Sequence, residues 1–413
     1  MVHPDFLVIG GGIIGLSIAR ELKARFANVR VTVIEKEPEC GWHASGRNSG
    51  VLHAGFYYSP DSFKAKFTRL GNKLLTEYCL SRKIPVNRCG KLVVARDASE
   101  LPGLDELLRR GRTNGVELHE LSELEARRIE PRVRTCEWAI WSPTTSVVTP
   151  AEVVSAMAQD ARNESVELRC GERFLGRTGR SVRTSTGTYE PGYVVNAAGL
   201  YADSIAREFG FAEQYRIIPF KGLYLYSDEP VGSLRTNVYP VPDLRNPFLG
   251  VHFTVTADGR SKIGPTAIPA FWREHYQGLQ RFRLSEFGEI VRRQLGLLVS
   301  SDWDFRRLAM EELRKYSRSR LVSLASALVE GVSETQYRRW GHPGIRAQLL
   351  DVKTGRLEMD FVLEGDDSSM HVLNAVSPGF TCAIPFADYV VARIEERLEV
   401  GGAGVHMPKA ARC

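Results

Sequence analysis

The sequence predicts an α/β protein in which a discontinuous, mainly parallel sheet domain is interrupted by an inserted, mainly antiparallel β domain. Three observations carry this prediction. An apolar run, a glycine-rich turn, a helical pattern and a second apolar run follow one another between residues 5 and 36. A similar strand and turn recur about 180 residues later. Between 215 and 343, several segments alternate in the manner of antiparallel strands.

The N-terminal unit places its glycines at a fixed spacing. The apolar residues 6–9 stop at Gly10, and Gly12 and Gly15 complete the pattern G-x-G-x-x-G. The first glycine permits a tight turn, the second lets a pyrophosphate approach the backbone, and the third lets the helix pack closely on the strand. A second strand, 29–34, ends in Glu35, where a carboxylate can hold a ribose hydroxyl. The pattern predicts a Rossmann-like dinucleotide-binding unit; an ordinary βαβ unit with a glycine-rich turn is the alternative.

Length and composition narrow the class of protein. A chain of 413 residues is long enough for roughly two or three domains. Its net charge of +6 is too small to argue for nucleic acid as a partner. Seven cysteines, without a C-x-x-C motif or a Cys/His cluster, predict a reducing compartment and no metal site. No apolar run reaches the roughly 18 residues that would cross a bilayer.

A polar loop follows the first unit. Its small hydrogen-bonding residues suit a loop that folds over a pyrophosphate, and they are Ser45, Arg47, Asn48, Ser49 and Gly50. His53 then stands beside Ala54 and Gly55, where a flat ring system could approach closely. A structural role and a catalytic role are both open for this histidine.

The elements up to residue 170 have ordinary patterns. We expect helices at 63–80 and about 100–114, helix starts near 122 and 149, and strands at 91–95 and 166–169.

The second turn lies in the segment YVVNAAGLYAD, residues 193–203. It reads as a buried strand that ends in small residues and Gly199, followed by a helix. Such a turn can close over an ADP group already held by the first. Two turns about 180 residues apart favour one long ligand gripped by converging segments, which describes FAD better than NAD.

Polar residues stand at strand ends in the inserted domain and just after it. Lys221, Tyr239 and His252 occupy such positions, and a structural role in the sheet is the alternative for each. Arg346 is the best single candidate for binding a substrate carboxylate, because a guanidinium can bond it bidentately. The helix start at 377–383 could stabilise negative charge on a reduced flavin.

The segment 271–320 is basic and contains an amphipathic helix. One face of this helix carries Phe287, Ile290, Val291, Leu295 and Leu298. A peripheral membrane contact, a dimer helix and a helix packed on its own sheet are the interpretations, and the last is favoured.

These features resemble the D-amino-acid-oxidase-like FAD oxidoreductases, and within them the L-2-hydroxyglutarate dehydrogenases (oxidases). The residues that carry the resemblance span nearly the whole chain. They are GRNSGVLHAGFYY at 46–58, KAK at 64–66, CGKLVVA at 89–95, NAAGLYAD at 196–203, IIPFKG at 217–222, VYPVPD at 238–243, NPFLGVHFT at 246–254, GIRAQ at 344–348 and NAVSP at 374–378.

The resemblance implies non-covalent FAD as cofactor, L-2-hydroxyglutarate as substrate and 2-oxoglutarate as product. It assigns FAD contacts to Gly10, Gly12, Gly15, Glu35, Ser45, Asn48, Ser49, Gly199 and Thr381. We extend this set to the neighbouring or similarly placed Ile13, Ile14, Lys36, Arg47, Gly50, Arg173, Ala198, Gly379 and Phe380. The resemblance also implies that His53 lies beside the isoalloxazine ring.

The mechanism expected on this basis is hydride transfer from substrate C2 to flavin N5, while a base removes the hydroxyl proton. His53 is the first choice for the base and His252 the reserve. A small dicarboxylate needs two anchors. We assign one to Arg346 and the other to a set that comprises Lys221, Lys66, Tyr57 and Tyr239.

Two rival functions stay open at this point. One is an FAD-dependent amine or amino-acid oxidase of the glycine or sarcosine oxidase type. The other is a flavoprotein with structural FAD whose sheet domain binds a protein or RNA partner. For the favoured function, the resemblance suggests a quinone or membrane electron chain, or oxygen, as electron acceptor.

We expect an FAD-binding domain of residues 1–85, 147–214 and 344–400, a substrate domain of 86–146 and 215–343, and a flexible tail at 401–413. The expected location is the cytoplasm, with a peripheral position on the inner face of the cell membrane left open. The sequence makes no prediction of oligomeric state.

Overall fold

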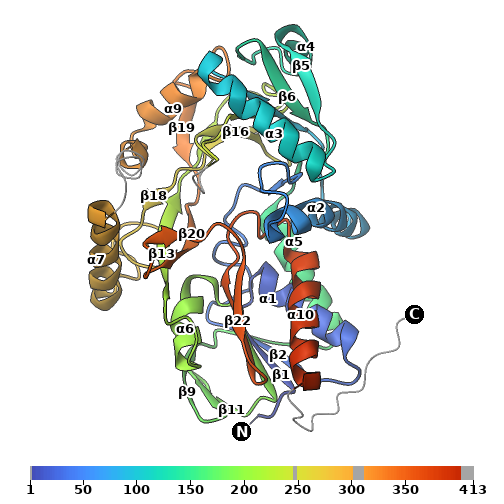
Figure 1. Ribbon diagram of the computed structural model, residues 1–413, viewed down its shortest axis with the longest axis vertical. Coiled ribbons are helices and arrows are strands. Elements are labelled where there is room, and N and C mark those ends of the chain that lie inside the picture. The colour runs from blue at the N-terminus through green and yellow to red at the C-terminus, as the bar shows by residue number, and fades with distance from the viewer. Residues whose placement is uncertain (1, 245–248, 301–310, 401–413) are drawn as a thin grey trace. The chain divides into compact units, whose positions relative to one another are not determined.

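The computed structural model describes residues 2–244, 249–300 and 311–400, and the chain divides into two compact units (Figure 1). The first unit contains the residues up to Gly46, Pro150–Ile217 and the residues from Ala347 onward. The second unit contains Arg47–Thr149 and Ile218–Arg346. The expected tail at 401–413 lies outside the described residues.

Residues 47–85 belong to the second unit, whereas the sequence had grouped them with the FAD-binding domain. The reason lies in strand pairing: β3 (Val51–Leu52) pairs with β7 (Ser146–Val147) in an antiparallel ladder. Gly50 also accepts a backbone hydrogen bond from Val148, 2.9 Å from nitrogen to oxygen. The chain therefore changes unit directly after the polar loop begins.

The first unit is built on a six-stranded sheet in the order β22-β23-β12-β1-β2-β8. Its strands run parallel, except that β22 is antiparallel to β23. The bounds are β1 Phe6–Ile9, β2 Val31–Glu35, β8 Glu167–Cys170, β12 Tyr193–Asn196, β22 Val362–Gly365 and β23 Ser369–Asn374. All four residues of β1 are buried, as the apolar run predicts for a central parallel strand.

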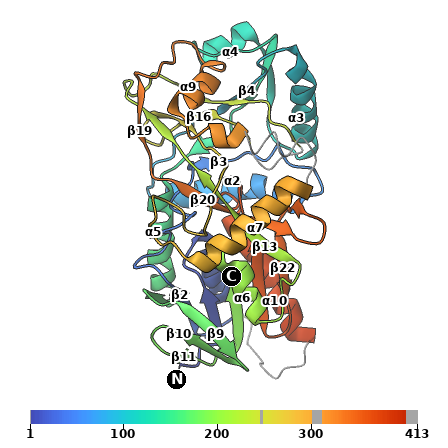
Figure 2. The same cartoon turned by 90° about the vertical axis from the view of Figure 1, so that its left-hand side faces the viewer.

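Helices cover this sheet. α1 (Ile13–Arg25) packs against α5 (Pro150–Asn163) and α10 (Ala383–Val400), as Figure 1 shows. α6 (Ala202–Glu208) packs against β23 and against β9, which belongs to a small sheet in the order β11-β10-β9 (Figure 2). The strands of that sheet are β9 Phe174–Thr178, β10 Ser181–Thr184 and β11 Thr188–Tyr189.

The second unit is built on an eight-stranded sheet in the order β19-β14-β17-β16-β15-β4-β6-β5. Most of its ladders are antiparallel, as predicted, and the pair β15–β4 is parallel. The bounds are β4 Lys91–Val94, β5 His119–Ser122, β6 Trp138–Ser142, β14 Leu225–Ser227, β15 Asn237–Pro240, β16 His252–Val255, β17 Ser261–Gly264 and β19 Tyr337–Trp340.

The two faces of this sheet differ in chemistry. On one face, Leu92, Val238, Phe253 and Ile263 form an apolar core with residues of the helices α4 (Glu123–Ile129) and α9 (Arg318–Ser326). Because side chains alternate along a strand, the neighbouring residues point to the other face. That second face is partly covered by α3 (Leu101–Thr113).

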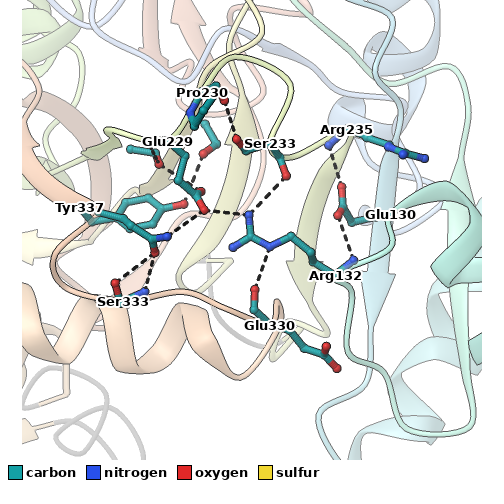
Figure 3. A network of polar contacts seen from close by, with 12 residues as sticks. Glu130, Arg132, Glu229, Pro230, Ser233, Arg235, Glu330, Ser333 and Tyr337 are labelled. Carbon is teal, nitrogen blue, oxygen red and sulfur yellow. Dashed lines mark hydrogen bonds and ion pairs between the residues drawn. The ribbon is translucent and has the colours of Figure 1, made fainter.

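A polar network joins elements from distant parts of the second unit (Figure 3). Arg132 donates to Glu229 at 2.9 Å and to the carbonyl of Glu330 at 2.8 Å. The buried carboxylate of Glu130 accepts from the backbone nitrogens of Arg132 and Arg235, at 3.1 and 2.7 Å. The network links the segment after α4 to the ends of β14 and β15, and so braces the apolar side of the sheet.

The remaining elements are α2 (Phe63–Ser81), α7 (Leu284–Ser300), β13 (Tyr215–Gly222), β18 (Ile268–Pro269), β20 (Gly344–Asp351) and β21 (Arg356–Leu357), with short 3₁₀ turns at Ala98–Glu100 and Gly199–Tyr201. The expected amphipathic helix is present as α7, and its Ile290 is buried as predicted. Leu295, however, is 56% exposed, and Leu297 is buried in its place. The packed face of α7 is therefore rotated relative to the predicted one. The side chain of Leu298, which was also predicted on this face, lies outside the described residues. Among the described residues, no helix combines the length and the apolar character that crossing a bilayer requires.

Candidate active site

The first turn of the Rossmann-like unit is tight because its glycines leave no room for side chains. Gly10 adopts a φ of 113°, and a Cβ on it would lie 2.5 Å from the carbonyl oxygen of Ala197. A Cβ on Gly15 would lie 2.0 Å from the carbonyl oxygen of Gly10. The first and third glycines thus serve the close packing of strand, turn and helix that the spacing predicts.

The start of α1 is arranged to face an anion. Gly12 is the residue before the helix, and a Cβ there would come within 3.0 Å of the Ser45 hydroxyl. Ser45 accepts a hydrogen bond from the backbone nitrogen of Ile13 at 2.9 Å. The first turn of α1, which includes Ile14, has no acidic residue to offset the positive end of the helix dipole. These features suit a pyrophosphate at the helix N-terminus.

Glu35 closes β2 with a buried carboxylate. Its two oxygens accept hydrogen bonds from the backbone nitrogens of Gly11, at 2.8 Å, and Glu37, at 2.9 Å. A carboxylate held in this way keeps further acceptor positions for the hydroxyls of a ribose. The next residue, Lys36, contacts the Glu37 carboxylate and lies 2.7 Å from His43 Nε2.

The second turn joins the first within the same unit. β12 pairs with β1 in register, so Asn196 lies opposite Ile9. Asn196 accepts from the backbone nitrogen of Ala198 at 3.2 Å and donates to the carbonyl of Ala202 at 2.8 Å, which fixes the turn. Gly199 has a φ of 54° and open space where a Cβ would stand. Two segments far apart in the chain therefore converge, as the sequence predicts for one long ligand.

Three further predicted contacts lie in the segment before α10. Gly379 donates to the carbonyl of Val376 at 2.9 Å, and Thr381 is fully buried next to Phe380. Arg173 is different, because its side chain is exposed and its backbone is bonded to Ser185. Its nitrogen donates to the Ser185 hydroxyl at 3.0 Å, and its carbonyl accepts from the Ser185 nitrogen at 2.9 Å.

The first unit as a whole fits the ADP part of FAD. It offers a glycine turn that admits no side chain, a helix N-terminus without an acidic residue, and a carboxylate at the adjacent strand end.

The predicted pyrophosphate loop lies largely in the second unit. Asn48 accepts from the Gly50 nitrogen at 2.9 Å, and Ser49 accepts from the Val51 nitrogen at 3.3 Å. The guanidinium of Arg47 lies 4.6 Å from the ring centre of Tyr276. These contacts fold the loop on itself ahead of β3.

The face of the eight-stranded sheet opposite the apolar core, here called the polar face, carries several buried polar side chains of the second unit. Alternation opposite the apolar core places on this face Lys91, Tyr239, His252, Thr254 and Lys262. All five are buried. Five buried residues with polar side chains on one face of a sheet indicate a ligand site rather than a packing surface.

Both candidate bases are buried and neutral at physiological pH. The pKa of His53 is well below its usual range because of burial first, and then because of the charges of Lys91, His252 and Arg346. Burial also lowers the pKa of His252 to about 3. A neutral imidazole can accept a proton, so either ring has the protonation state that a general base needs.

The tautomer of His252 is fixed by its surroundings. Its Nδ1 lies 3.0 Å from the carbonyl oxygen of Gly250, and a carbonyl can only accept, so Nδ1 carries the proton. Nε2 is then the nitrogen with the lone pair. The ring also stacks on Tyr239, with 3.6 Å between ring centres. Orientation and proton position are both set before any ligand binds.

Three cations accompany the imidazoles. Arg346 is partly buried and keeps its charge, although burial lowers its pKa. Lys262 donates to the Ser49 carbonyl at 3.0 Å and lies 4.7 Å from the ring centre of Tyr224, and burial lowers its pKa to about 8. Lys91 is fully buried, and burial lowers its pKa to about 7.

The structure separates the other predicted anchors. Tyr57 and Tyr239 both lie against Lys91. Lys221 is buried on β13, outside the eight-stranded sheet. There its charge adds to burial, the larger cause, in lowering the pKa of His275. Lys66 lies on the exposed side of α2, with its ammonium over Phe67.

A comparison with known protein families agrees with both units. The family model for the FAD dependent oxidoreductases (DAO) matches residues 5–393. The chain belongs to this FAD-dependent oxidoreductase family. Its cofactor is FAD, which is consistent with the glycine turn and the Glu35 carboxylate described above.

Within the FAD-dependent oxidoreductases, the chain belongs with the L-2-hydroxyglutarate dehydrogenases. It is 36% identical to the mitochondrial enzyme of Nematostella vectensis, over 96% of this chain and 91% of that one. It is 34% identical to the mitochondrial enzyme of Homo sapiens, over 96% and 89%. It is 33% identical to the enzyme of Escherichia coli K12, over 95% and 94%.

Two solved structures of other oxidases share the fold. An L-alpha-glycerophosphate oxidase from Mycoplasma pneumoniae, with FAD bound, matches with a TM-score of 0.76 at 21% identity, over 100% of this chain and 97% of that one. A glycine oxidase from Geobacillus kaustophilus matches with a TM-score of 0.70 at 20% identity, over 100% of both chains.

Two buried lysines of this FAD-dependent oxidoreductase were missed by the sequence analysis. Lys91 and Lys262 each open or interrupt an apolar strand, and a lysine at such a place is usually solvent-exposed. The burial of Lys91 could have been predicted from strand alternation, because Lys91 lies on the same face as Val93 and Ala95, which belong to the buried core.

Proposed function

We propose that this protein oxidises L-2-hydroxyglutarate to 2-oxoglutarate with FAD as the hydride acceptor. The relatives that carry this name match nearly their whole length, and the family is FAD-dependent. The observation that carries the proposal is the polar face of the second unit, which holds the neutral His252 together with Lys91 and Lys262. The neutral His53 and the cation Arg346 lie close enough to these groups to interact with them electrostatically. A dicarboxylate with a hydroxyl group has the complementary charge and the proton to give up.

The charges favour a hydroxy acid over an amino acid. Substrates of an amine oxidase carry an ammonium group near the carbon that is oxidised. In this site such a group would lie near Lys91, Lys262 and Arg346, and like charges at short range in a buried site are costly. A neutral hydroxyl has no such cost. This is why we retain the hydroxy acid and not the glycine- or sarcosine-type alternative.

The residues divide the work as follows. FAD, when bound, supplies the acceptor for the hydride that leaves substrate C2. His53 accepts the hydroxyl proton as the first-choice base, and His252, with its lone pair on Nε2, is the alternative. Arg346 binds one carboxylate through its fixed fork of donors. Burial of His53 and His252 excludes water and strengthens their interactions.

The test is reduction of the bound flavin in the absence of oxygen, monitored as a loss of flavin absorbance. L-2-hydroxyglutarate, its D-isomer, lactate, glycine and sarcosine would be compared on the same preparation. We expect bleaching by the L-isomer alone. Bleaching by glycine or sarcosine instead would transfer the protein to the amine-oxidase branch and refute the proposal.

We propose further that the electrons pass to a quinone or to oxygen. The reduced protein would be mixed with oxygen or with a soluble quinone, and the return of flavin absorbance would be timed. Faster reoxidation by the quinone supports a dehydrogenase; faster reoxidation by oxygen supports an oxidase.

Finally, we propose a peripheral contact between the α7 region and an acidic membrane surface. Leu279, Leu284 and Leu295 are 79%, 74% and 56% exposed, and Arg283 and Arg292 are exposed near them. Apolar side chains next to cations are the composition of interfacial segments. Co-sedimentation with anionic but not neutral vesicles, lost in the variant L279E/L284E, is the expected result. Sedimentation that ignores lipid charge would contradict it.

A further inference from the structure

We propose that Lys91, together with Tyr57, binds the second carboxylate of the substrate and thereby makes the enzyme specific for dicarboxylates. The inference rests on the proposed function and deepens it, because it names the group that binds the substrate carboxylate farther from the hydroxyl carbon. The ligand class is a short diacid whose second carboxylate is reached by a buried ammonium.

The position of the Lys91 ammonium is unusual. It lies 4.5 Å from the ring centre of Tyr57, 4.7 Å from that of Phe56 and 4.8 Å from that of Tyr239. The Phe56 and Tyr57 rings stack on each other, at 4.4 Å. Lys91 therefore projects from the first residue of β4 into an aromatic cage on the polar face.

Within the described residues, the Lys91 ammonium and the Tyr57 hydroxyl are both buried without a hydrogen-bond partner. Buried polar groups in folded proteins are nearly always hydrogen-bonded, and a buried charge is nearly always paired. Cation–π contacts compensate only part of this cost. Two buried donors without partners, with the Lys91 ammonium over the Tyr57 ring, are therefore best explained by an acceptor that arrives with the ligand.

The electrostatics identify that acceptor as an anion. Burial lowers the pKa of Lys91 to about 7, and no carboxylate of the described residues raises it. A ligand carboxylate within bonding distance favours the charged form and so raises this pKa. Binding a carboxylate at Lys91 should therefore draw in a proton whenever the free enzyme holds the amine neutral.

Lys91 and Arg346 both lie near the two imidazoles. The charges of Lys91 and of Arg346 both lower the pKa values of His53 and His252, so both cations are within electrostatic reach of the two rings. In L-2-hydroxyglutarate the hydroxyl carbon lies between two carboxylates. Arg346 for the near carboxylate and Lys91 for the far one leave the hydroxyl to the imidazoles.

The test uses two inert ligands of equal chain length on the FAD-loaded enzyme. Glutarate has two carboxylates and pentanoate has one, and calorimetry gives a dissociation constant for each. A charge-assisted hydrogen bond corresponds to about a 10- to 100-fold preference for glutarate in the wild type. The variant Lys91→Met fills the cage without a charge, and we expect it to lose most of that preference.

Lys262→Met is the matched control. Lys262 is also buried on the same face, but its ammonium is already bonded to the Ser49 carbonyl. We expect this variant to lose stability and to reduce the preference for glutarate over pentanoate much less than Lys91→Met does. Flavin absorbance and thermal unfolding show whether each variant is folded and loaded.

A second readout needs no variant. Calorimetry of glutarate binding in two buffers of different ionisation enthalpy gives the number of protons taken up. We expect about one proton at pH 8.5 and almost none at pH 6, since a group of pKa about 7 is neutral at the first pH and charged at the second. His53 and His252 stay neutral at both, Arg346 and the tyrosines do not titrate there, and Lys262, with a pKa of about 8, is separated by its own variant.

The outcomes are distinguishable. A preference that survives in Lys91→Met, or proton uptake that is the same at both pH values, overturns the role of Lys91 while the proposed reaction stands. A wild-type flavin that L-2-hydroxyglutarate does not reduce refutes the reaction itself. An equal loss of glutarate and pentanoate binding in Lys91→Met assigns the residue a purely structural role and also overturns the inference.

Discussion

The pH dependence of kcat/KM for L-2-hydroxyglutarate follows from the buried groups of the polar face. On the acid side, activity should stay level, because the base is an imidazole whose pKa lies well below the usual value. An ordinary histidine with a pKa near 6.5 would lose about eightfold in its basic form between pH 7 and 5.5. With a pKa of about 3, as for His252, the change over this interval is negligible.

On the alkaline side, activity should fall. The far carboxylate binds a protonated Lys91, and this group loses its proton above a pKa of about 7. The fall approaches tenfold per pH unit until the weaker binding of the neutral amine takes over. The sign is opposite to that of an enzyme limited by a free histidine, which gains activity as pH rises through 6.5.

Stopped-flow measurement of flavin reduction at low substrate concentration, from pH 5.5 to 9, gives this profile directly. The variant Lys91→Met serves as control and should lack most of the alkaline fall. A wild-type rate that rises from pH 5.5 to 7.5 would refute the assignment of a buried, neutral base. An alkaline fall that is unchanged in the variant would refute the role of Lys91.

Three further predictions concern single side chains. Ser45→Ala removes the acceptor of the hydrogen bond from the Ile13 nitrogen. Loss of a helix N-cap costs about 1 kcal/mol, so FAD affinity measured by fluorescence should fall by about fivefold. Unchanged affinity would contradict a role of this contact in FAD binding. His53→Gln should slow flavin reduction by about 10² to 10⁴ with FAD still bound, and a larger loss in His252→Gln would exchange the two roles. Lys91→Met should raise the free energy of unfolding most at pH 7 or below. Between about pH 7 and 10.5, Lys91 binds more protons in the unfolded chain than in the folded one, so wild-type stability rises with pH. The difference in unfolding free energy between Lys91→Met and the wild type should therefore narrow by about 2 kcal/mol from pH 7 to 9. Denaturant titrations that show a constant difference would contradict this.

The nucleotide unit could be predicted from sequence because its signals are local. Glycine spacing, an apolar run and a carboxylate at a strand end each act within a few residues, and the structure has the turn, the helix and the strand where they were expected. The convergence of the second turn on the first was also predictable, since both follow buried strands of one parallel sheet.

The substrate side was less accessible. His53, His252, Tyr57, Tyr239 and Arg346 were expected at a site, but no local pattern brings residues of β4, β15, β16 and β20 together. Sheet order brings β4, β15 and β16 together through pairings between distant segments, whereas β20 belongs to a different sheet. Lys91 was not predicted at the site because a lysine side chain is usually exposed to solvent. Its position in alternation with buried residues, however, indicated that its side chain is buried.

Two details differ from expectation for a related reason. The compact units change at Gly46, whereas the expected FAD-binding domain continues to residue 85; the pairing of β3 with β7 that separates them is a long-range contact. Leu295 was expected on the packed face of α7 and is exposed while Leu297 is buried, because helical periodicity places a packed face only approximately around the helix.

The most direct test of the account is a single-turnover experiment without oxygen. One equivalent of L-2-hydroxyglutarate is added to the FAD-loaded protein, absorbance near 450 nm is followed, and the product is identified by mass. The account predicts one 2-oxoglutarate formed for each flavin reduced. A flavin that stays oxidised, or that is reduced without formation of 2-oxoglutarate, would contradict it.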